Sequence, residues 1–356
     1  MTKPALTGIT KDELTEALAS IGEPSYRAAQ ILQWVFEKRA TGFGQMSNLG
    51  RALREELADR YTLRSSAPAQ EANSDDTTQK YLYRLHDGRY VESVLIPANP
   101  ALYGDKSDRH TICVSSQVGC AYDCKFCASG LAGFTRNLSS AEIVEQILHT
   151  EQISGEKVNN LVFMGMGEPL ANLTNLLRAI EIINADWGIG IGARKMTIST
   201  SGLAPQIKKL AEQPQQVRLA ISLHGATDAV REQIMPVNRK YPLATLTEAL
   251  AYYQERKKQK ITFEYILIEG INDSLKQATE LAKLARRLHT KVNLIPYNTV
   301  EGLPWKRPDV PRQEAFLAVL QRAGVTATLR REKGHDINAA CGQLRLKRET
   351  AEGVIA

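Results

Sequence analysis

The sequence predicts an α/β protein, a partial (β/α)6 barrel preceded by a small helical domain and a linking β-hairpin. From Thr111 onward, strand-like and helix-like segments alternate six times, and such alternation implies a parallel sheet with right-handed crossovers. The first 65 residues instead carry apolar residues at helical spacing. Between these two parts, Asp87-Gly88 separates two alternating runs, which is a strong hairpin signal.

The helical domain is expected to contain three helices. Thr10 and Glu13 have the spacing of a capping box, so a first helix should begin there. Two further helices are expected over 26–38 and 49–60, and the polar, aperiodic residues 66–79 predict a loop. The expected organisation is 1–65 as the helical accessory domain, 80–97 as the linking hairpin, 98–343 as the barrel with a C-terminal cysteine segment, and 344–356 as a frayed tail.

The barrel is expected to place its functional groups at the C-terminal ends of its strands, as complete (β/α) barrels do. The expected strands are 112–117, 160–163, 196–199, 217–222, 261–268 and 292–295. The expected helices are 140–153, 173–184, 204–212, 227–235 with 243–257, 274–288 and 311–323. The first of these helices begins with a capping box, Ser139 and Glu142.

The composition is that of a globular protein with a basic balance. The chain has 356 residues, a net charge of +6 and a sequence pI of about 9.0, which modestly favours a polyanionic partner. No signal-peptide core and no run of 18 apolar residues is present, so we expect no membrane span. Five cysteines, three of them clustered, exclude a secreted disulfide framework and predict a cytoplasmic protein.

Cys120, Cys124 and Cys127 form a C-x3-C-x2-C run. Three thiolates can hold three irons of a [4Fe–4S] cluster, which leaves the fourth iron open to a small molecule. The alternatives are a zinc site or buried structural thiols. Zinc usually requires a second C-x2-C or a His pair downstream, and the sequence has neither. The run therefore favours an open, catalytic cluster.

Further polar residues follow the expected strands. Each alone is also typical of a plain turn or loop, and a lone His is more often a core residue; their shared position at one end of the sheet makes them candidates. The candidates are Gly167 and Glu168 after the second strand, Ser199 in the third, Ser222, Leu223 and His224 at the fourth, and Asn298 after the sixth.

Two more cysteines lie outside the cluster run. Cys113 lies in the first barrel strand, where a small buried residue is expected. Cys341 lies in a polar, Gly-flanked stretch, with Arg330, Arg331 and Lys333 nearby in sequence. An exposed thiolate near positive charge is a strong nucleophile, so Cys341 is a candidate for covalent chemistry.

The cysteine run, with Phe126 before its last member, resembles the radical S-adenosylmethionine (SAM) superfamily. Almost the whole chain resembles the RlmN-type dual-specificity RNA methyltransferases of that superfamily. The stretches that carry this resemblance are GCAYDCKFCASGLAGFTRNL, FMGMGEPLANL, MTISTSGLAP, AISLHGATDAVREQIMPVN, VNLIPYN and DINAACGQL. The additional cysteine pair distinguishes this family from other radical SAM enzymes.

The resemblance implies methylation of C2 of adenosine in 23S rRNA and in tRNA. By analogy, Cys341 takes a methyl group from one SAM, and a second SAM on the cluster yields a 5′-deoxyadenosyl radical that activates it. The carbon radical adds to C2, Glu92 removes the C2 proton, and Cys113 releases the product by forming a transient disulfide with Cys341. The implied cofactors are one [4Fe–4S] cluster, held by Cys120, Cys124 and Cys127, and two SAM per turnover.

The resemblance also implies contacts and partners. SAM contacts carry over onto Gly167, Glu168, Ser199, Ser222, Leu223, His224 and Asn298. The partners are 23S rRNA, tRNA and a low-potential electron donor such as flavodoxin or ferredoxin, and the protein is expected to be a monomer. The candidate RNA contacts are the N-terminal domain, the basic run 256–260 and residues 305–307, although any single basic run is also typical of a solvated face.

Two alternatives stay open at this point. A Cfr-type enzyme, which methylates C8 of the same kind of adenosine in 23S rRNA, has the same cysteines. A non-catalytic iron–sulfur protein that binds RNA or senses redox state would need the cluster but not Cys341 or Glu92. The sequence departs from the commoner family pattern in a longer 98–110 loop and in His335, which lies close to Cys341.

Overall fold

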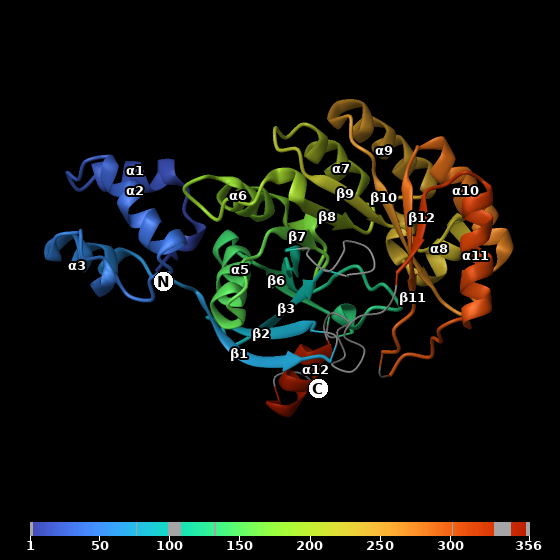
Figure 1. Cartoon of the computed structure of the whole chain (residues 1–356), viewed down its shortest axis with the longest axis horizontal. Helices are drawn as coiled ribbons and strands as arrows, with labels where there is room; N and C mark the ends of the chain where they lie inside the picture. Colours follow the sequence, from blue (N-terminus) through green and yellow to red (C-terminus); the bar gives the residue numbers. More distant parts are fainter. Residues whose placement is uncertain are drawn as a thin grey trace.

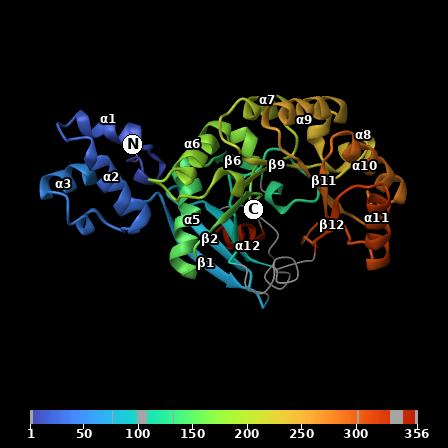
Figure 2. The same ribbon diagram turned by 45° about the horizontal axis from the view of Figure 1, so that its top comes forward.

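A ten-stranded sheet forms the centre of the molecule, and its strand order is β1-β2-β3-β4-β7-β8-β9-β10-β11-β12. The structure, a computed structural model, describes residues 3–75, 77–98, 108–131, 133–300, 302–330 and 343–353. From β4 to β12 every neighbouring pair of strands is parallel. The sheet curves with its helices on the outside (Figure 1, Figure 2), which confirms the partial barrel.

The barrel elements lie close to their predicted positions. The strands are β4 (His110–Cys113), β7 (Asn160–Phe163), β8 (Met196–Thr200), β9 (Arg218–Ser222), β10 (Thr262–Leu267), β11 (Lys291–Pro296) and the additional β12 (Ala327–Leu329). The helices are α5 (Ser140–Ser154), α6 (Leu173–Asn184), α7 (Ala204–Ala211), α8 (Asp228–Ile234), α9 (Leu243–Lys257), α10 (Leu275–Arg287) and α11 (Val310–Arg322). Short helical turns precede or follow them as η5 (Pro169–Asn172), η6 (Ala193–Lys195) and η7 (Pro236–Arg239).

The first barrel strand is shorter than predicted. β4 ends at Cys113, so the expectation of a single strand over 112–117 is wrong. The chain leaves the sheet and forms a separate two-stranded ribbon from β5 (Gln117–Gly119) and β6 (Phe134–Asn137). This ribbon begins and ends the cysteine loop, which also contains the turn η4 (Ala128–Gly130).

The linking hairpin is confirmed, with β2 (Gln79–Leu85) antiparallel to β3 (Tyr90–Pro97). Gly88 has φ +80°, the left-handed conformation that a three-residue hairpin loop needs at its last position. The predicted loop over 66–79 is wrong, because β1 (Ser66–Asn73) pairs with β2. β1 is an edge strand that is mostly exposed, so its side chains are polar and give no alternating signal.

The N-terminal helical domain contains the three predicted helices. They are α1 (Lys11–Ala19), α2 (Tyr26–Leu32) and α3 (Arg51–Arg60), with the turns η1 (Leu6–Gly8) and η3 (Phe43–Gln45). The capping box of Thr10 and Glu13 is present. The second predicted helix changes to a π-helix, η2 (Gln33–Glu37), for its last residues.

A buried carboxylate joins this domain to the barrel. Glu145 of α5 is fully buried, and it accepts hydrogen bonds from Thr7 Oγ1 at 2.6 Å, the backbone N–H of Ser65 and Ser66 Oγ at 2.5 Å. Burial raises the pKa of Glu145, and the hydrogen bonds oppose that rise. The contact fixes the helical domain against α5.

The C-terminal residues form a helix, α12 (Gln343–Ala351), so the prediction of a frayed tail over 344–356 is wrong for these residues. Arg345 and Glu349 form an ion pair of 2.8 Å between side chains that are 1% and 0% exposed. Glu349 also accepts a hydrogen bond from the backbone N–H of Tyr90 on β3 at 3.2 Å. Both views place α12 beside the hairpin strands (Figure 1, Figure 2).

Candidate active site

The backbone after β7 approaches a neighbouring strand closely. Gly167 has φ +99°, and a Cβ placed on it would lie 2.5 Å from Gln117 Cβ. Only glycine fits this position. The next residue, Glu168, donates its backbone N–H to Gln117 Oε1 at 2.8 Å. The predicted residues Gly167 and Glu168 therefore lie at the C-terminal end of the sheet beside the cysteine loop.

The Glu168 side chain connects the ends of two strands. It is buried, and Oε1 accepts from Leu170 N at 3.0 Å while Oε2 accepts from Ser201 N at 2.7 Å and Ser201 Oγ at 2.8 Å. Burial raises its pKa, and the Ser201 hydrogen bonds oppose the rise. Because both oxygens are bonded to protein, the carboxylate holds the β7 end against the β8 end.

The ends of β8 and β9 bring two predicted hydroxyls together. Ser199 Oγ and Ser222 Oγ lie 3.3 Å apart. Leu223, the next residue, is fully buried and donates its backbone N–H to the Glu264 carbonyl at 3.0 Å. Two adjacent hydroxyls at the end of parallel strands suit the polar groups of a nucleoside or amino acid ligand.

His224 is held as a neutral imidazole. Its Nδ1 accepts a hydrogen bond from the backbone N–H of Ile266 at 3.0 Å, so the ring proton lies on Nε2. Burial lowers its pKa to about 3, with Arg231 adding to the effect. The ring packs edge-on against Phe126, with centroids 4.9 Å apart. His224 thus connects the barrel to the cysteine loop.

The last predicted residue of this group, Asn298, follows β11. It is half-buried, and its Oδ1 accepts a hydrogen bond from Arg307 Nη2 at 2.9 Å. Gly167, Glu168, Ser199, Ser222, Leu223, His224 and Asn298 therefore all lie at the C-terminal ends of their strands, as predicted.

The three clustered cysteines lie in the loop between β5 and β6. Gly119 and Gly133 close this loop so tightly that a Cβ on Gly119 would lie 1.9 Å from the Gly133 carbonyl oxygen. Burial raises the pKa of Cys120 to about 12 and that of Cys124 well above its usual value, and Cys127 contributes to both increases.

Desolvated thiols such as those of Cys120 and Cys124 are poor thiolates when no cation is present, and bound iron supplies the compensating positive charge. In the part of the chain that the structure describes, no three His, Cys, Asp or Glu side chains converge as the ligands of a single metal ion do. A cluster does not need that convergence, because each cysteine binds a different iron. The donor set therefore fits a cluster.

A second group of residues lies on one face of the hairpin. Lys80 pairs with Val94, and Val94 pairs with Cys113, so these three residues form a row across β2, β3 and β4. Glu92 lies two residues from Val94 and faces the same side. Its Oε2 is 2.9 Å from Lys80 Nζ, and both side chains are almost completely buried. As a diagonal neighbour, its Cα lies roughly 7–8 Å from that of Cys113.

Cys341 lies outside the described residues, but the helix that follows it is described. Arg345 donates its backbone N–H to Glu92 Oε1 at 2.5 Å, and Gln343 Nε2 donates to the Thr299 carbonyl at 3.4 Å. α12 also contacts η4, the turn directly after Cys127. The start of α12 therefore lies among Glu92, the residue next to Asn298 and the cysteine loop.

Two arginines that the sequence did not indicate connect these parts. Arg231 is fully buried and donates to the carbonyls of Leu223, at 3.1 Å, and Ser201. Burial lowers its pKa to about 10. Both Arg231 and Ser201 lie in stretches that resemble the family, but the sequence assigned neither a role, because their contacts form only in the folded chain.

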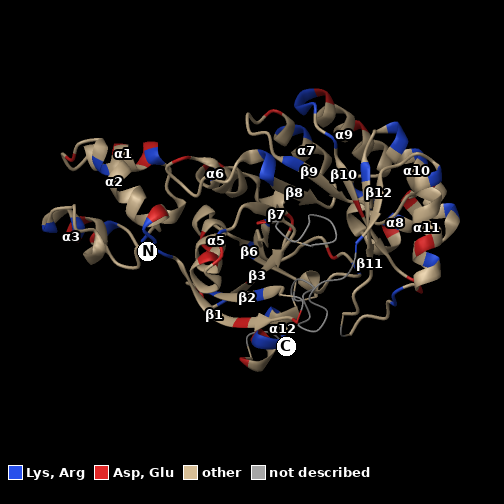
Figure 3. Ribbon diagram, in the orientation of Figure 1, with Lys and Arg blue, Asp and Glu red and all other residues tan. Residues whose placement is uncertain are grey.

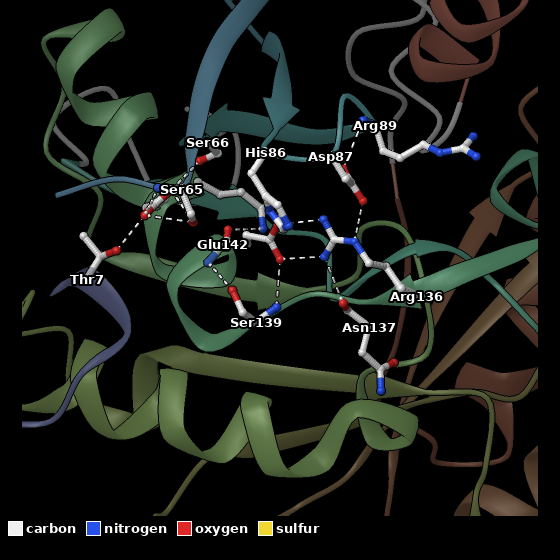
Figure 4. Close-up of polar contacts among 12 residues, drawn as sticks. Thr7, Ser65, Ser66, His86, Asp87, Arg89, Arg136, Asn137, Ser139 and Glu142 are labelled. Atoms are coloured by element: carbon white, nitrogen blue, oxygen red, sulfur yellow. Dashed lines mark hydrogen bonds and ion pairs between the residues drawn. The ribbon is translucent and has the colours of Figure 1, made fainter. Parts of the chain in front are cut away.

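Arg136 of β6 joins the cysteine loop to the hairpin and to α5. Its guanidinium binds Glu142 through two hydrogen bonds of 2.8 Å and Asp87 of the hairpin turn through one of 2.6 Å. Figure 4 shows Arg136 between these two carboxylates, with His86 beside Glu142. These contacts fix the cysteine loop relative to the strands that carry Lys80 and Glu92.

Comparison with known proteins is consistent with this site. The family model for the radical SAM superfamily matches residues 114–282, and that for the ribosomal RNA large subunit methyltransferase N-terminal domain matches 5–63. The probable dual-specificity RNA methyltransferase RlmN of Akkermansia muciniphila is 55% identical over 346 residues, which cover 97% of this chain and 96% of that protein. The chain belongs to the RlmN family.

Two further similar proteins agree with this assignment. The probable dual-specificity RNA methyltransferase RlmN 3 of Opitutus terrae is 53% identical over 367 residues, 99% of this chain and 97% of that protein. The crystal structure of a radical SAM methyltransferase from Sphaerobacter thermophilus superposes with a TM-score of 0.89 and 43% identity, covering 96% of this chain and 98% of that one. Membership of the RlmN family confirms that the protein is a radical SAM RNA methyltransferase. Its cofactors are a [4Fe–4S] cluster and SAM, as expected. The alternative of a non-catalytic iron–sulfur protein is therefore disfavoured.

Proposed function

We propose that this chain methylates C2 of adenosine in 23S rRNA and in tRNA, with the methyl group carried on Cys341. One observation carries the proposal: the start of α12 lies among Glu92, the residue beside Asn298 and the cysteine loop. Cys341 lies two residues before that start. Cys341 is therefore our candidate for the methyl carrier, since the described helix that follows it contacts the proposed base and the cysteine loop.

Cys120, Cys124 and Cys127 would hold the cluster, and the strand-end residues would hold SAM on its open iron. When bound, these groups supply the 5′-deoxyadenosyl radical that activates a methyl group on Cys341. Glu168, Ser201 and the neutral His224 hold the strand ends in place around that site. Burial of these groups excludes water, which protects reactive intermediates.

Glu92 is proposed as the base that takes the C2 proton from the RNA adduct. The carboxylate has a fixed position, because Lys80 and the backbone of Arg345 bind its two oxygens. Cys113 on the neighbouring strand is proposed to attack Cys341 sulfur. That attack breaks the sulfur–carbon bond and forms a sulfur–sulfur bond, and the electron pair of the broken bond stays on the carbon, which takes up a proton to become the methyl group.

The partners of the reaction are also proposals. RNA is expected to contact the helical domain, the run 256–260 and residues 305–307, where basic side chains can bind phosphates. Figure 3 shows Lys and Arg distributed over both the helical domain and the outer helices. We further propose a low-potential electron donor such as flavodoxin or ferredoxin, a monomeric enzyme and a cytoplasmic location. No described helix is long and apolar enough to cross a membrane.

Nucleoside mass spectrometry of RNA from a host that lacks its own enzyme, with and without this gene, tests the proposal. We expect 2-methyladenosine in both 23S rRNA and tRNA. The appearance of 8-methyladenosine in rRNA alone would instead establish the Cfr-type reaction. If no methyladenosine forms although the purified protein carries its cluster, both methyltransferase reactions are excluded. The Cys341→Ala variant, which lacks the carrier, should form neither nucleoside.

A further inference from the structure

Lys80 lies in a place that stability alone does not explain. Its side chain is completely buried, and Nζ lies 2.9 Å from Glu92 Oε2. Burying such a pair costs desolvation free energy that its attraction only partly returns, and apolar residues of similar volume are often at least as stable. A lysine at this position therefore points to a role for its charge.

We propose that Lys80 is a positioning residue for the C2 deprotonation, holding the Glu92 carboxylate aimed at the adduct. This inference rests on the function proposed above. Ser115 Oγ donates to the Glu92 carbonyl at 2.7 Å, and Arg345 N donates to Oε1 at 2.5 Å. These bonds fix the backbone and one oxygen of Glu92, and Lys80 supplies the positive charge at the other oxygen.

The groups around this carboxylate come from three elements. β2 contributes Lys80, β4 contributes the thiol of Cys113, and α12 contributes the buried pair of Arg345 and Glu349. The charged pair on α12 is internally neutralised. α5 lies against the other face of the hairpin, where Ser93 and Tyr83 bind its side chains. Among the residues that the structure describes, Lys80 is thus a charge paired directly with Glu92 on this face.

The assisted step is a proton transfer. The C2–H bond of the adenine adduct breaks, its proton passes to a Glu92 oxygen, and the bonding electron pair stays in the ring. Burial disfavours the charged form of a carboxylate, and a nearby cation opposes this effect. Loss of Lys80 removes the partner that holds Glu92 Oε2, so it should impair this step and leave earlier steps unchanged.

The test compares Lys80→Met with Lys80→Arg in the cluster-loaded full-length enzyme. Single-turnover formation of 2-methyladenosine is followed across pH, together with methylation of Cys341 and formation of 5′-deoxyadenosine. For Lys80→Met we expect a loss on the order of 10²-fold at neutral pH, since a general base contributes about 10²–10⁴-fold. The acidic limb of its pH profile should move to higher pH. Lys80→Arg should keep the wild-type profile.

Methylation of Cys341 and formation of 5′-deoxyadenosine should continue in Lys80→Met, so that 5′-deoxyadenosine exceeds product and a covalent protein–RNA adduct persists. Arg84→Met is the matched control, because Arg84 is an exposed residue on the same strand; its rate and profile should equal those of the wild type. If Lys80→Met does not fold, Lys80→Gln, which keeps a hydrogen-bond donor beside Glu92, takes its place with the same expected shift.

An unchanged pH profile in Lys80→Met would overturn the proposal. So would an equal loss in Cys341 methylation, 5′-deoxyadenosine and product, because that pattern indicates a general structural defect. Failure of the proposed function itself is recognised separately, since the wild-type enzyme would then form neither methyl-Cys341 nor 2-methyladenosine.

Discussion

Arg345 of the C-terminal helix donates its backbone N–H to Glu92 Oε1 at 2.5 Å, although 253 positions separate the two residues in sequence. The carboxylate therefore binds the first turn of α12, where unpaired N–H groups favour negative charge. Cys341 lies four residues before Arg345. The hydrogen bond thus ties the proposed base to the helix that follows the proposed methyl carrier in sequence.

The anchoring of α12 leads to a first prediction. Glu349→Ala leaves the Arg345 guanidinium buried without its partner, and breaking a buried pair in this way costs about 3–5 kcal/mol. The helix should detach more easily than the barrel unfolds. We expect faster limited proteolysis near the C-terminus and loss of 2-methyladenosine formation, with an unchanged iron content.

Arg348→Ala is the control for this change. Arg348 lies on the same helix, and its pair with Glu352 is partly exposed, so proteolysis and activity should stay at wild-type levels. If Glu349→Ala methylates RNA at the wild-type rate, the position of α12 is not important for catalysis.

Cys113→Ala leads to a second prediction. Without the resolving thiol, the methylene bridge between Cys341 and the adenine cannot be released. Labelled RNA should therefore stay attached to the protein in a denaturing gel, and product should not accumulate. The double variant Cys113→Ala with Cys341→Ala should trap no RNA. Trapping in the double variant would mean that another residue carries the methyl group.

The Arg136 contacts give a third prediction. Arg136 and Glu142 hold each other through two hydrogen bonds. Losing these bonds should cost on the order of 2–3 kcal/mol, while Glu142 keeps the hydrogen bond from Ser139 N. The pKa of Asp87 is lowered, chiefly by Arg136, although its burial acts in the opposite direction. A depressed carboxyl pKa contributes stability above its unfolded value, and that contribution is lost as pH falls through the folded value.

Arg136→Gln should therefore unfold at lower urea concentration than the wild type at neutral pH, and the difference should shrink below about pH 4 as Asp87 is protonated. The variant should also lose iron faster, because the cysteine loop is less firmly held. Lys208→Gln, at an exposed pair with Glu248, is the control. A constant difference at all pH values would contradict the assigned role of Asp87.

The hairpin shows which contacts and elements the sequence alone can predict. Asp87-Gly88 predicted the turn, and the register of that turn places Lys80 diagonally beside Glu92, so this pair was predictable in principle. β1 was missed because an exposed edge strand needs no apolar alternation. α12 was missed for a related reason. It is held by the buried charged pair of Arg345 and Glu349, and the sequence of such a polar helix resembles that of a solvated tail.

The strand ends were predicted well, because parallel strands bring them to one edge and polar residues in successive turns mark that edge. The roles of Arg231 and Ser201 were not predicted. Their bonds to Leu223 and Glu168 join residues 8 and 33 positions apart and depend on how neighbouring strands align. A local pattern contains no information about such pairs.

His149 gives the last prediction, a pH dependence of stability. Burial lowers its pKa to about 4, while Ser66 opposes the change. In the unfolded chain the same imidazole takes up a proton below about pH 6.5, so this residue should destabilise the fold by about 2 kcal/mol between neutral pH and pH 5. Glu145 beside it has a raised pKa and acts in the opposite sense, so the comparison must be between variants. His149→Gln should lose less stability than the wild type on going from pH 7 to pH 5, as measured by urea unfolding. Equal losses in both proteins would mean that His149 is protonated in the folded state.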